Sequence, residues 1–238
     1  MNIKKLVSAF ALAATMLSAG TTAEAQTPRP EYPRPQFERS TWINLNGTWT
    51  YAFDFGRTGM DKGWNKTEGF DGKITVPFCP ESPLSGVKYT DFINSMWYQR
   101  KISIPADWDG KKILLNFGAV DYEAHVFIDG TVIGRHYGAG SSFSMDITKY
   151  VKAGHQHNLV LMVNDDLRGR KQLGGKQSLG FYSGGCNYTR VTGIWQTVWM
   201  EAVAKEGLKS VFATPDIDQK QLVIYPQFYN ESNTNKLV

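Results

Sequence analysis

The sequence contains few cysteines: only Cys79 and Cys186 occur among 238 residues. Two cysteines exclude a small domain held together by a framework of several disulfides. They could form one disulfide in an oxidising compartment, or they could remain two separate, half-buried thiols. The sequence leaves both alternatives open, because a disulfide requires Cα atoms within about 7 Å of each other and sequence does not give that distance.

The chain also lacks a strong excess of either charge and any long apolar run in its mature part. Its 26 basic and 22 acidic residues give a formal net charge of +4 and are scattered along the sequence. We therefore expect no nucleic-acid partner. No segment after the N-terminal one is apolar enough for a transmembrane helix, so we expect no membrane partner either.

The N-terminal segment has the pattern of a secretory signal peptide. Lys4 and Lys5 precede an apolar run from Leu6 to Leu17, and an A-x-A motif follows at 23–25. This pattern predicts that residues 1–25 are a signal peptide, cleaved after Ala25. The mature chain is therefore predicted to be periplasmic or secreted.

Helical periodicity is missing as well, since no window of helix length has a convincing period of 3.6 residues. Aromatic residues make up 13% of the chain and 23 residues are glycine. Aromatic strands joined by glycine-rich turns predict an all-β protein. Residues 26–40 contain four prolines and predict an extended leader before the first strand.

About eight to ten short strands are expected, which fits a sandwich of two β-sheets. The segment 122–136 contains two of them, joined at Asp129-Gly130 by a two-residue hairpin turn. The other segments that predict strands are 47–55, 73–78, 95–105, 111–118, 141–148, 157–165 and 191–201.

The stretch VTGIWQTVWME at 191–201 alternates strongly between two faces. Period-two alternation of this length predicts one continuous strand. Trp195 and Trp199 share a face in that pattern, together with Thr197 and Glu201. A sugar-binding ring must be exposed and flanked by polar groups. Because both rings lie in the middle of the predicted strand on one face, we expect them instead to pack under a neighbouring sheet, loop or domain.

Residues 205–238 do not continue this pattern. Two further strand signals, Leu208 to Ala213 and Gln221 to Tyr229, flank the turn sequence PDIDQK. Because an isolated hairpin is marginally stable at best, two strands cannot form a domain. We expect them to be the first strands of a truncated second sandwich.

An ordered set of motifs resembles a known family. LNGTW, VPFCPE, WYQR, FGAVDYEAHVFIDG and GIWQ follow one another in the order found in the N-terminal sugar-binding domain of glycoside hydrolase family 2. β-Galactosidases, β-glucuronidases and β-mannosidases belong to this family. The resemblance implies a galactose-binding-like jelly roll over 41–204 and the start of an immunoglobulin-like domain over 205–238.

The resemblance also implies retaining hydrolysis of β-glycosides by two glutamates on a (β/α)8 barrel. That barrel needs about 250 residues, and only 34 residues follow Ala204. We therefore expect no catalytic residue in this chain, which is then an accessory domain of an exported β-glycosidase and inactive alone. Asp121 and Glu123 are the nearest tempting carboxyl pair, but a sandwich face offers little to raise a carboxylate pKa.

The resemblance further implies that a jelly-roll loop contacts sugar hydroxyls at the mouth of the active site. The matching position is Asn187, three residues before Arg190, and these two residues are the first candidates for substrate binding. β-Galactosidase-like members have an acidic residue there, so the amide puts a preference for galactose in doubt. Glu81 and Ser82 in VPFCPESPLSG are a second pair of candidate substrate-binding residues, although a capped surface loop is the simpler explanation for them.

We expect no cofactor and no metal. His155 and His157 have no third ligand nearby, and Asp165-Asp166 would need several more oxygens to hold Ca²⁺. Two other functions stay open beside the accessory domain. The chain could be a stand-alone carbohydrate-binding module, or a structural sandwich that positions a separate catalytic partner.

Overall fold

The computed structural model describes residues 27–229, so the predicted signal peptide lies outside the described residues. The described part is all-β, as predicted, and its only helices are 3-10 helices of three residues each. Among the described residues, no helix is long and apolar enough to cross a bilayer. The 3-10 helices are η1 (Pro35–Phe37), η2 (Trp64–Lys66), η3 (Pro83–Ser85), η4 (Ala106–Trp108), η5 (Thr148–Tyr150) and η6 (Leu167–Gly169).

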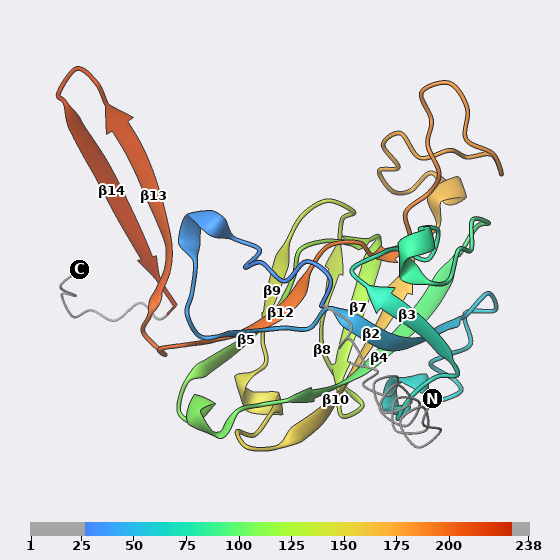
Figure 1. Cartoon of the computed structure of the whole chain (residues 1–238), viewed down its shortest axis with the longest axis horizontal. Helices are drawn as coiled ribbons and strands as arrows, with labels where there is room; N and C mark the ends of the chain where they lie inside the picture. Colours follow the sequence, from blue (N-terminus) through green and yellow to red (C-terminus); the bar gives the residue numbers. More distant parts are fainter. Residues whose placement is uncertain (1–26, 230–238) are drawn as a thin grey trace, which may run out of the picture.

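Two antiparallel sheets form the predicted jelly-roll sandwich (Figure 1). The four-stranded sheet has the order β1 (Trp42–Asn44), β12 (Val198–Val203), β5 (Lys112–Phe117), β9 (Phe143–Asp146). The six-stranded sheet has the order β3 (Gly72–Val76), β2 (Gly47–Phe53), β4 (Ser95–Ser103), β10 (Gln156–Asn164), β7 (Glu123–Ile128), β8 (Thr131–Tyr137). A short pair, β6 (Val120–Asp121) and β11 (Gly193–Ile194), lies beside them.

The core lies between the two sheets, where the apolar face of each covers the other. Ile113, Leu115 and Phe117 of β5 are buried, as their alternation predicts. Trp49 and Tyr98 meet edge to face with ring centroids 6.4 Å apart. The Trp49 indole N–H donates to the carbonyl of Leu45 at 2.8 Å, so this large ring is buried without an unsatisfied donor.

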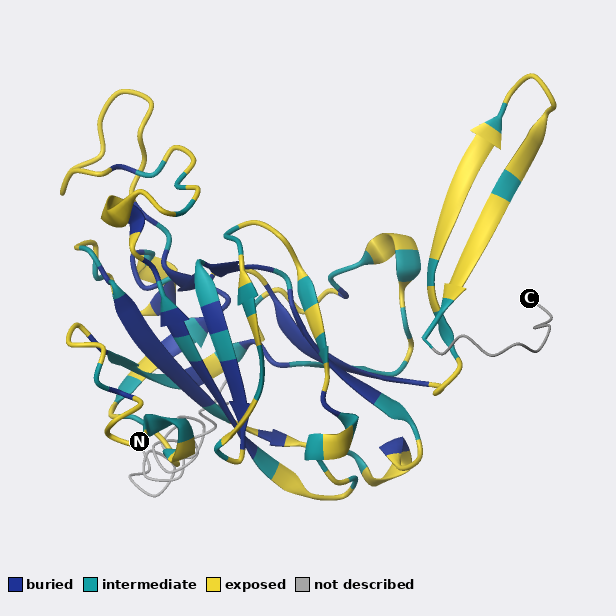
Figure 2. Cartoon of the chain, turned by 180° about the vertical axis from the view of Figure 1, so that it is seen from behind, coloured by how far each residue is buried: buried dark blue, intermediate teal, exposed yellow. Residues whose placement is uncertain are grey.

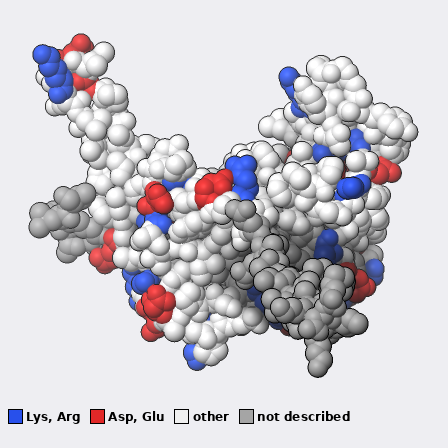
Figure 3. Space-filling model, viewed as in Figure 1, with Lys and Arg blue, Asp and Glu red and all other residues white. Residues whose placement is uncertain are grey.

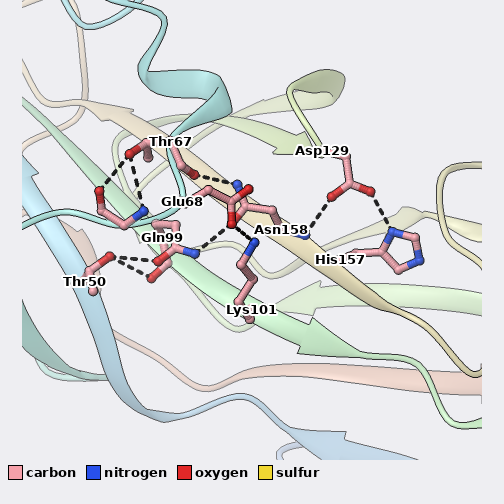
Figure 4. Close-up of polar contacts among 9 residues, drawn as sticks. Thr50, Thr67, Glu68, Gln99, Lys101, Asp129, His157 and Asn158 are labelled. Carbon is pink, nitrogen blue, oxygen red and sulfur yellow. Dashed lines mark hydrogen bonds and ion pairs between the residues drawn. The ribbon is translucent and has the colours of Figure 1, made fainter.

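The predicted hairpin turn at Asp129-Gly130 is confirmed. Both residues have positive φ, 49° and 80°, as a two-residue turn of this kind requires. The Asp129 carboxylate accepts from the backbone N–H of Asn158 at 2.8 Å and lies 2.6 Å from Nδ1 of His157 (Figure 4). The turn is thereby tied to the neighbouring strand β10.

The outer face of the six-stranded sheet is also partly covered. Trp97, Phe127 and Val160 form a small buried cluster there, against which Trp64 and Phe70 pack. A chain of polar contacts holds this cover in place (Figure 4): the Asn158 amide donates to Thr67 O at 2.6 Å, and Gln99 donates to Asn158 at 2.7 Å. The chain itself therefore covers the part of this face around Trp97.

The stretch 191–201 is not one strand, so that prediction is wrong. The chain leaves β11 at Ile194 and enters β12, in a different sheet, at Val198. Gly193 has a φ of +76°, and a Cβ there would lie 2.1 Å from the Tyr98 hydroxyl oxygen. Trp199 is packed as expected, at 1% exposure, but Trp195 lies in the connection and is 36% exposed.

The leader is clamped onto the sandwich. The hydroxyl of Tyr32, which is buried, donates to Oε1 of Glu201 at 2.7 Å, and Arg39 Nε lies 2.9 Å from Oε2 of the same carboxylate. Asn44 and Asn46 donate to the carbonyls of Arg29 and Pro28, at 2.8 and 3.0 Å. The proline-rich segment thus wraps along the four-stranded sheet.

Residues 208–228 form a separate hairpin of β13 (Leu208–Asp216) and β14 (Gln221–Phe228). It projects from the sandwich in Figure 1, and Figure 2 shows that both strands are largely exposed. Phe212, Leu222 and Ile224 are each more than half exposed. The two predicted strands are confirmed, and their assignment to an immunoglobulin-like domain stays a prediction.

Candidate functional site

The connection between β10 and β11, residues 165–192, carries Asn187 and Arg190. It stands above one end of the sandwich (orange in Figure 1) and contains only η6 and two isolated bridges. Regular ladders do not stabilise it, so its conformation depends on local backbone hydrogen bonds and on side-chain contacts. We call this segment the mouth loop.

Arg190 supplies several of the side-chain contacts. Its guanidinium donates to the carbonyls of Gly180 at 2.6 Å and Ser178 at 3.3 Å, and also to the carbonyl of Thr90 on a different segment. The guanidinium carbon lies 4.1 Å from the centroid of the Phe92 ring. Arg190 is only 3% exposed. It holds the mouth loop together from beneath, and its predicted contact with sugar stays a prediction.

Asn187 lies at the exposed tip of the mouth loop. Its backbone N–H and C=O form a reciprocal pair of 3.1 Å bonds with Gly184, which closes a tight turn. The side-chain amide has no hydrogen bond within the described residues, so its donor and acceptor are both free. It borders a cavity of about 490 Å³ that is also lined by Arg170, Gln172, Gln177, Ser178 and Leu179.

Glu81 and Ser82 lie in the connection after β3 and have different surroundings. The hydroxyl of Ser82 accepts from the backbone N–H of Leu84 at 3.2 Å, which makes it the N-cap of η3. The Glu81 carboxylate points inward and accepts from the backbone N–H of Thr192 at 3.2 Å. The structure therefore brings Glu81, but not Ser82, to the base of the mouth loop.

Two further buried carboxylates accompany Glu81, and sequence reasoning did not find this group. Asp121 accepts from the Gln177 amide at 2.8 Å, and Asp165 accepts from the Thr192 hydroxyl at 2.9 Å. Glu81 Oε1 and Asp121 Oδ1 have no hydrogen-bond partner. We call these three side chains the carboxyl cluster.

The pair Asp121 and Glu123, considered from the sequence, does not form. Glu123 instead lies 2.7 Å from Nε2 of His125 and accepts from Asn164 at 3.3 Å. Asp121 faces the mouth loop through Gln177. The two carboxyl groups therefore have separate partners, and nothing in their contacts provides the paired arrangement that retaining hydrolysis requires.

Burial makes the carboxyl groups of the cluster weaker acids than usual. Burial raises the pKa of Glu81 to about 7. Burial also raises the pKa of Asp121 to about 7, and the nearby Asp165 charge adds to that effect. The pKa of Asp165 is raised by burial as well, although hydrogen bonds from Gln172 and Thr192 oppose this. A low-dielectric site with several carboxyls favours their neutral forms.

Metal ligation has no support in the described part of the chain. No group of three or more His, Cys, Asp or Glu side chains there could hold an ion. His157 binds Asp129, and the Asp165 oxygens already accept from Gln172 at 2.7 Å and from Thr192. The amide and hydroxyl groups of the mouth loop that line the cavity at Asn187 suit binding of a polar ligand instead.

The two cysteines are separate thiols rather than a disulfide. Cys79 is half-buried and Cys186 is exposed on the mouth loop. Burial, with the nearby Glu81 charge, raises the pKa of the Cys79 thiol to about 12. Of the two alternatives, the structure therefore has the unpaired one.

The architecture and the mouth loop define a two-sheet β-sandwich domain with a polar loop site at one end. Residues 43–203 match the family described as "Glycosyl hydrolases family 2, sugar binding domain". The chain belongs to this family, and the resemblance seen in the sequence is confirmed.

Relatives with known names fit this membership. A β-galactosidase of Thermoanaerobacter pseudethanolicus is 25% identical over 184 residues, which is 73% of this chain and 22% of the relative. A β-glucuronidase of Felis catus is 30% identical over 120 residues, 46% of this chain and 18% of the relative. This chain therefore spans about a fifth of the length of these relatives.

Solved structures show the same fold. A crystal structure of Ruminococcus gnavus β-glucuronidase in complex with uronic isofagomine superposes with a TM-score of 0.65 at 21% identity. The match covers 82% of this chain and 34% of that structure. The likeness establishes the β-sandwich architecture of this part of the molecule.

Proposed function

We propose that this chain is the N-terminal sugar-binding domain of an exported β-glycosidase, whose catalytic glutamates lie on a barrel outside residues 1–238. The observation that carries the proposal is the mouth loop, which Arg190 holds from beneath while Asn187 presents a free amide above a cavity. An amide both donates to and accepts from hydroxyl groups, which suits a sugar. Membership of the family supports this assignment.

Charge and cleavage pattern support the rest of the proposal. Figure 3 shows Lys and Arg interspersed with Asp and Glu on the visible face, without the single-sign patch that a nucleic-acid partner would require. The N-terminal pattern of basic, apolar and A-x-A segments supports export. The role is therefore accessory: the domain contributes binding groups to a site completed by another domain.

The purified chain is expected to release no nitrophenol from nitrophenyl β-galactoside, β-glucuronide or β-mannoside. Retaining hydrolysis needs two carboxyl groups about 5 Å apart on either side of the glycosidic bond, and the carboxyl cluster is buried under the mouth loop. Absorbance at 405 nm, compared with a buffer blank, measures the release. Turnover that persists through a second purification step would contradict the assignment of catalysis to another domain.

Asn187 is expected to account for weak monosaccharide binding by the isolated domain. We expect methyl β-glucuronide at about 10 mM to shift the side-chain amide resonances of Asn187 in a ¹⁵N NMR spectrum. Asn187→Ala should weaken the binding about tenfold, the effect of losing about 1.4 kcal/mol of hydrogen bonding.

The matched control is Gln36→Ala, which removes an exposed amide from the leader. This variant should bind as the parent does. If the sugar shifts the mouth-loop resonances of Asn187→Ala as much as those of the parent, Asn187 does not contact the sugar.

A further inference from the structure

A second concave surface lies between the leader and the connection that joins β11 to β12. This groove has a volume of about 920 Å³. The residues that matter for its chemistry are Arg29, Glu31, Arg34, Ser142, Trp195 and Gln196. None of its lining residues borders the cavity at Asn187, so the two are separate sites.

Trp195 forms a rigid aromatic wall of this groove. Its indole N–H donates to the carbonyl of Ala139 at 2.8 Å, which fixes the ring against the connection between β8 and β9. The ring is nevertheless 36% exposed. An indole whose polar atom is already bound presents a flat apolar face, which suits the C–H face of a pyranose ring.

Polar groups lie beside this ring. Gln196 is exposed and follows Trp195 directly. Gln196 packs closely against Gly118: a Cβ on residue 118 would lie 2.7 Å from the Gln196 Cβ, so a larger residue there would displace the Gln196 side chain. An exposed amide next to an aromatic face provides both donor and acceptor for sugar hydroxyls.

Arg34 gives the groove its charge preference. Its guanidinium lies 5.1 Å from the centroid of the Trp199 ring and makes one long hydrogen bond, 3.4 Å to the Ser144 hydroxyl. Its other N–H groups have no hydrogen bond within the described residues. Arg29 is paired with Glu31 at 2.7 Å, which leaves Arg34 as the unpaired charge. A planar guanidinium held over an aromatic ring is suited to bind a carboxylate through two parallel hydrogen bonds.

We propose that this groove binds an anionic oligosaccharide, with one sugar ring stacked on Trp195 and an acidic group of the chain held by Arg34. The proposal rests on the carbohydrate recognition proposed above and adds a second site with its own ligand class. A uronic acid and a sulfated sugar share this chemistry, since both present an oxyanion beside a pyranose ring. The experiment separates these two sources.

Isothermal titration calorimetry of the chain tests the proposal with three tetrasaccharides: an oligogalacturonate, a sulfated galactan fragment and neutral cellotetraose. We expect a Kd of about 0.1 to 1 mM for at least one anionic probe, and binding at least tenfold weaker for cellotetraose. Heat with the oligogalacturonate alone assigns carboxylate as the ligand. Heat with both anionic probes supports the shared oxyanion chemistry. No heat with any probe, or equal affinity for cellotetraose, overturns the proposal.

Variants locate the site. Trp195→Ala should weaken binding at least tenfold, and Trp195→Phe should retain most of it because a flat ring remains. Arg34→Gln should reduce the affinity for anionic probes to that for cellotetraose and remove its dependence on salt. If Trp195→Ala fails to fold, the Trp195→Phe and Arg34→Gln results decide alone. Binding that survives Arg34→Gln unchanged overturns the proposal.

Two controls distinguish this groove from the mouth loop. Tyr182→Ser removes a ring of the mouth loop that is 91% exposed and should leave binding unchanged. Asn187→Ala should likewise leave tetrasaccharide binding intact. If tetrasaccharide binding is absent while Asn187→Ala still weakens monosaccharide binding, the groove proposal fails and the proposed function stands.

Discussion

Glu201→Ala is expected to lower the free energy of unfolding by about 3–5 kcal/mol, the usual cost of removing one partner from a buried ion pair. Glu201 has no exposed surface, and its Oε1 accepts from Tyr32 at 2.7 Å and from the Trp199 indole at 2.5 Å. Its Oε2 lies 2.9 Å from Arg39 Nε. Alanine would leave two buried donors without an acceptor and would remove the carboxylate that faces the partly buried Arg39 guanidinium.

The effect should reach both ends of the domain. Arg39 also donates to the carbonyl of Leu208 at 3.0 Å and to the Tyr229 hydroxyl at 3.4 Å, so the Glu201 carboxylate connects the leader to the β13–β14 hairpin through one side chain. We therefore expect trypsin to cleave Glu201→Ala faster at the Arg39-Ser40 bond under native conditions, since release of the leader exposes this bond, while Arg29 and Arg34 precede prolines and are poor trypsin sites.

Urea denaturation and limited trypsin digestion measure these two consequences. Glu201→Gln keeps an acceptor for Tyr32 and Trp199 but removes the charge that faces Arg39, so its loss of stability should be smaller. The matched control is Glu38→Ala, which removes an exposed carboxylate from the same leader. A Glu201→Ala protein as stable as Glu38→Ala would show that the leader is not held through this carboxylate.

Most of the sandwich could be predicted from local pattern. β4, β5 and β10 alternate apolar and polar residues, or are apolar throughout, over lengths typical of strands. The Asp129-Gly130 turn is predictable because both residue types tolerate the positive φ that a two-residue hairpin turn requires. The failure at 191–201 has a specific cause. Period two continues through Trp195, but a close approach of Tyr98 at Gly193 and a change of sheet break the strand, and neither is visible locally.

The candidate sites were less predictable, because their residues meet through tertiary structure. Glu81, Asp121 and Asp165 come from three separate connections or strand ends, and no spacing in the sequence links them. Asn187 could be singled out only through resemblance to the family. The groove at Trp195 was missed because the tryptophan was assigned to a strand. Three residues separate Ile194 from Val198, so the period-two alternation stays in phase across the connection. The pattern therefore gives no hint that the two strands belong to different sheets.

The carboxyl cluster predicts that this domain loses stability as the pH rises from about 4 to 7. Glu81 and Asp121 have ordinary pKa values of 4.5 and 3.8, and burial raises the pKa of each to about 7 in the folded chain. In this window the folded state binds more protons than the unfolded state. The free energy of unfolding therefore falls with rising pH, and the loss is complete once both groups are ionised above pH 7.

Each group alone would contribute on the order of 3 kcal/mol to this loss, at about 1.4 kcal/mol for each pKa unit. A domain of this size changes its Tm by about 2–4 °C per kcal/mol. With both groups contributing, we therefore expect the Tm to fall by roughly 10–20 °C between pH 5 and pH 8. Hydrogen bonds lower the pKa of Asp54, Asp129 and Asp146. Their contribution to the stability of the domain is lost only at more acidic pH, where they become protonated.

Differential scanning calorimetry from pH 5 to pH 8 measures this slope, and the variant Glu81→Gln/Asp121→Asn isolates its source. The neutral side chains should raise the Tm at pH 8 and flatten the profile, because no buried charge then forms at these two positions. His136 acts in the opposite direction, since burial lowers its pKa, but it is present in both proteins and cancels in the comparison. Asp109→Asn, at an exposed position, should leave the slope unchanged. Asp165, whose pKa burial also raises, remains in the double variant, so a shallower slope should remain there. A slope as steep as that of the parent would mean that Glu81 and Asp121 ionise without cost.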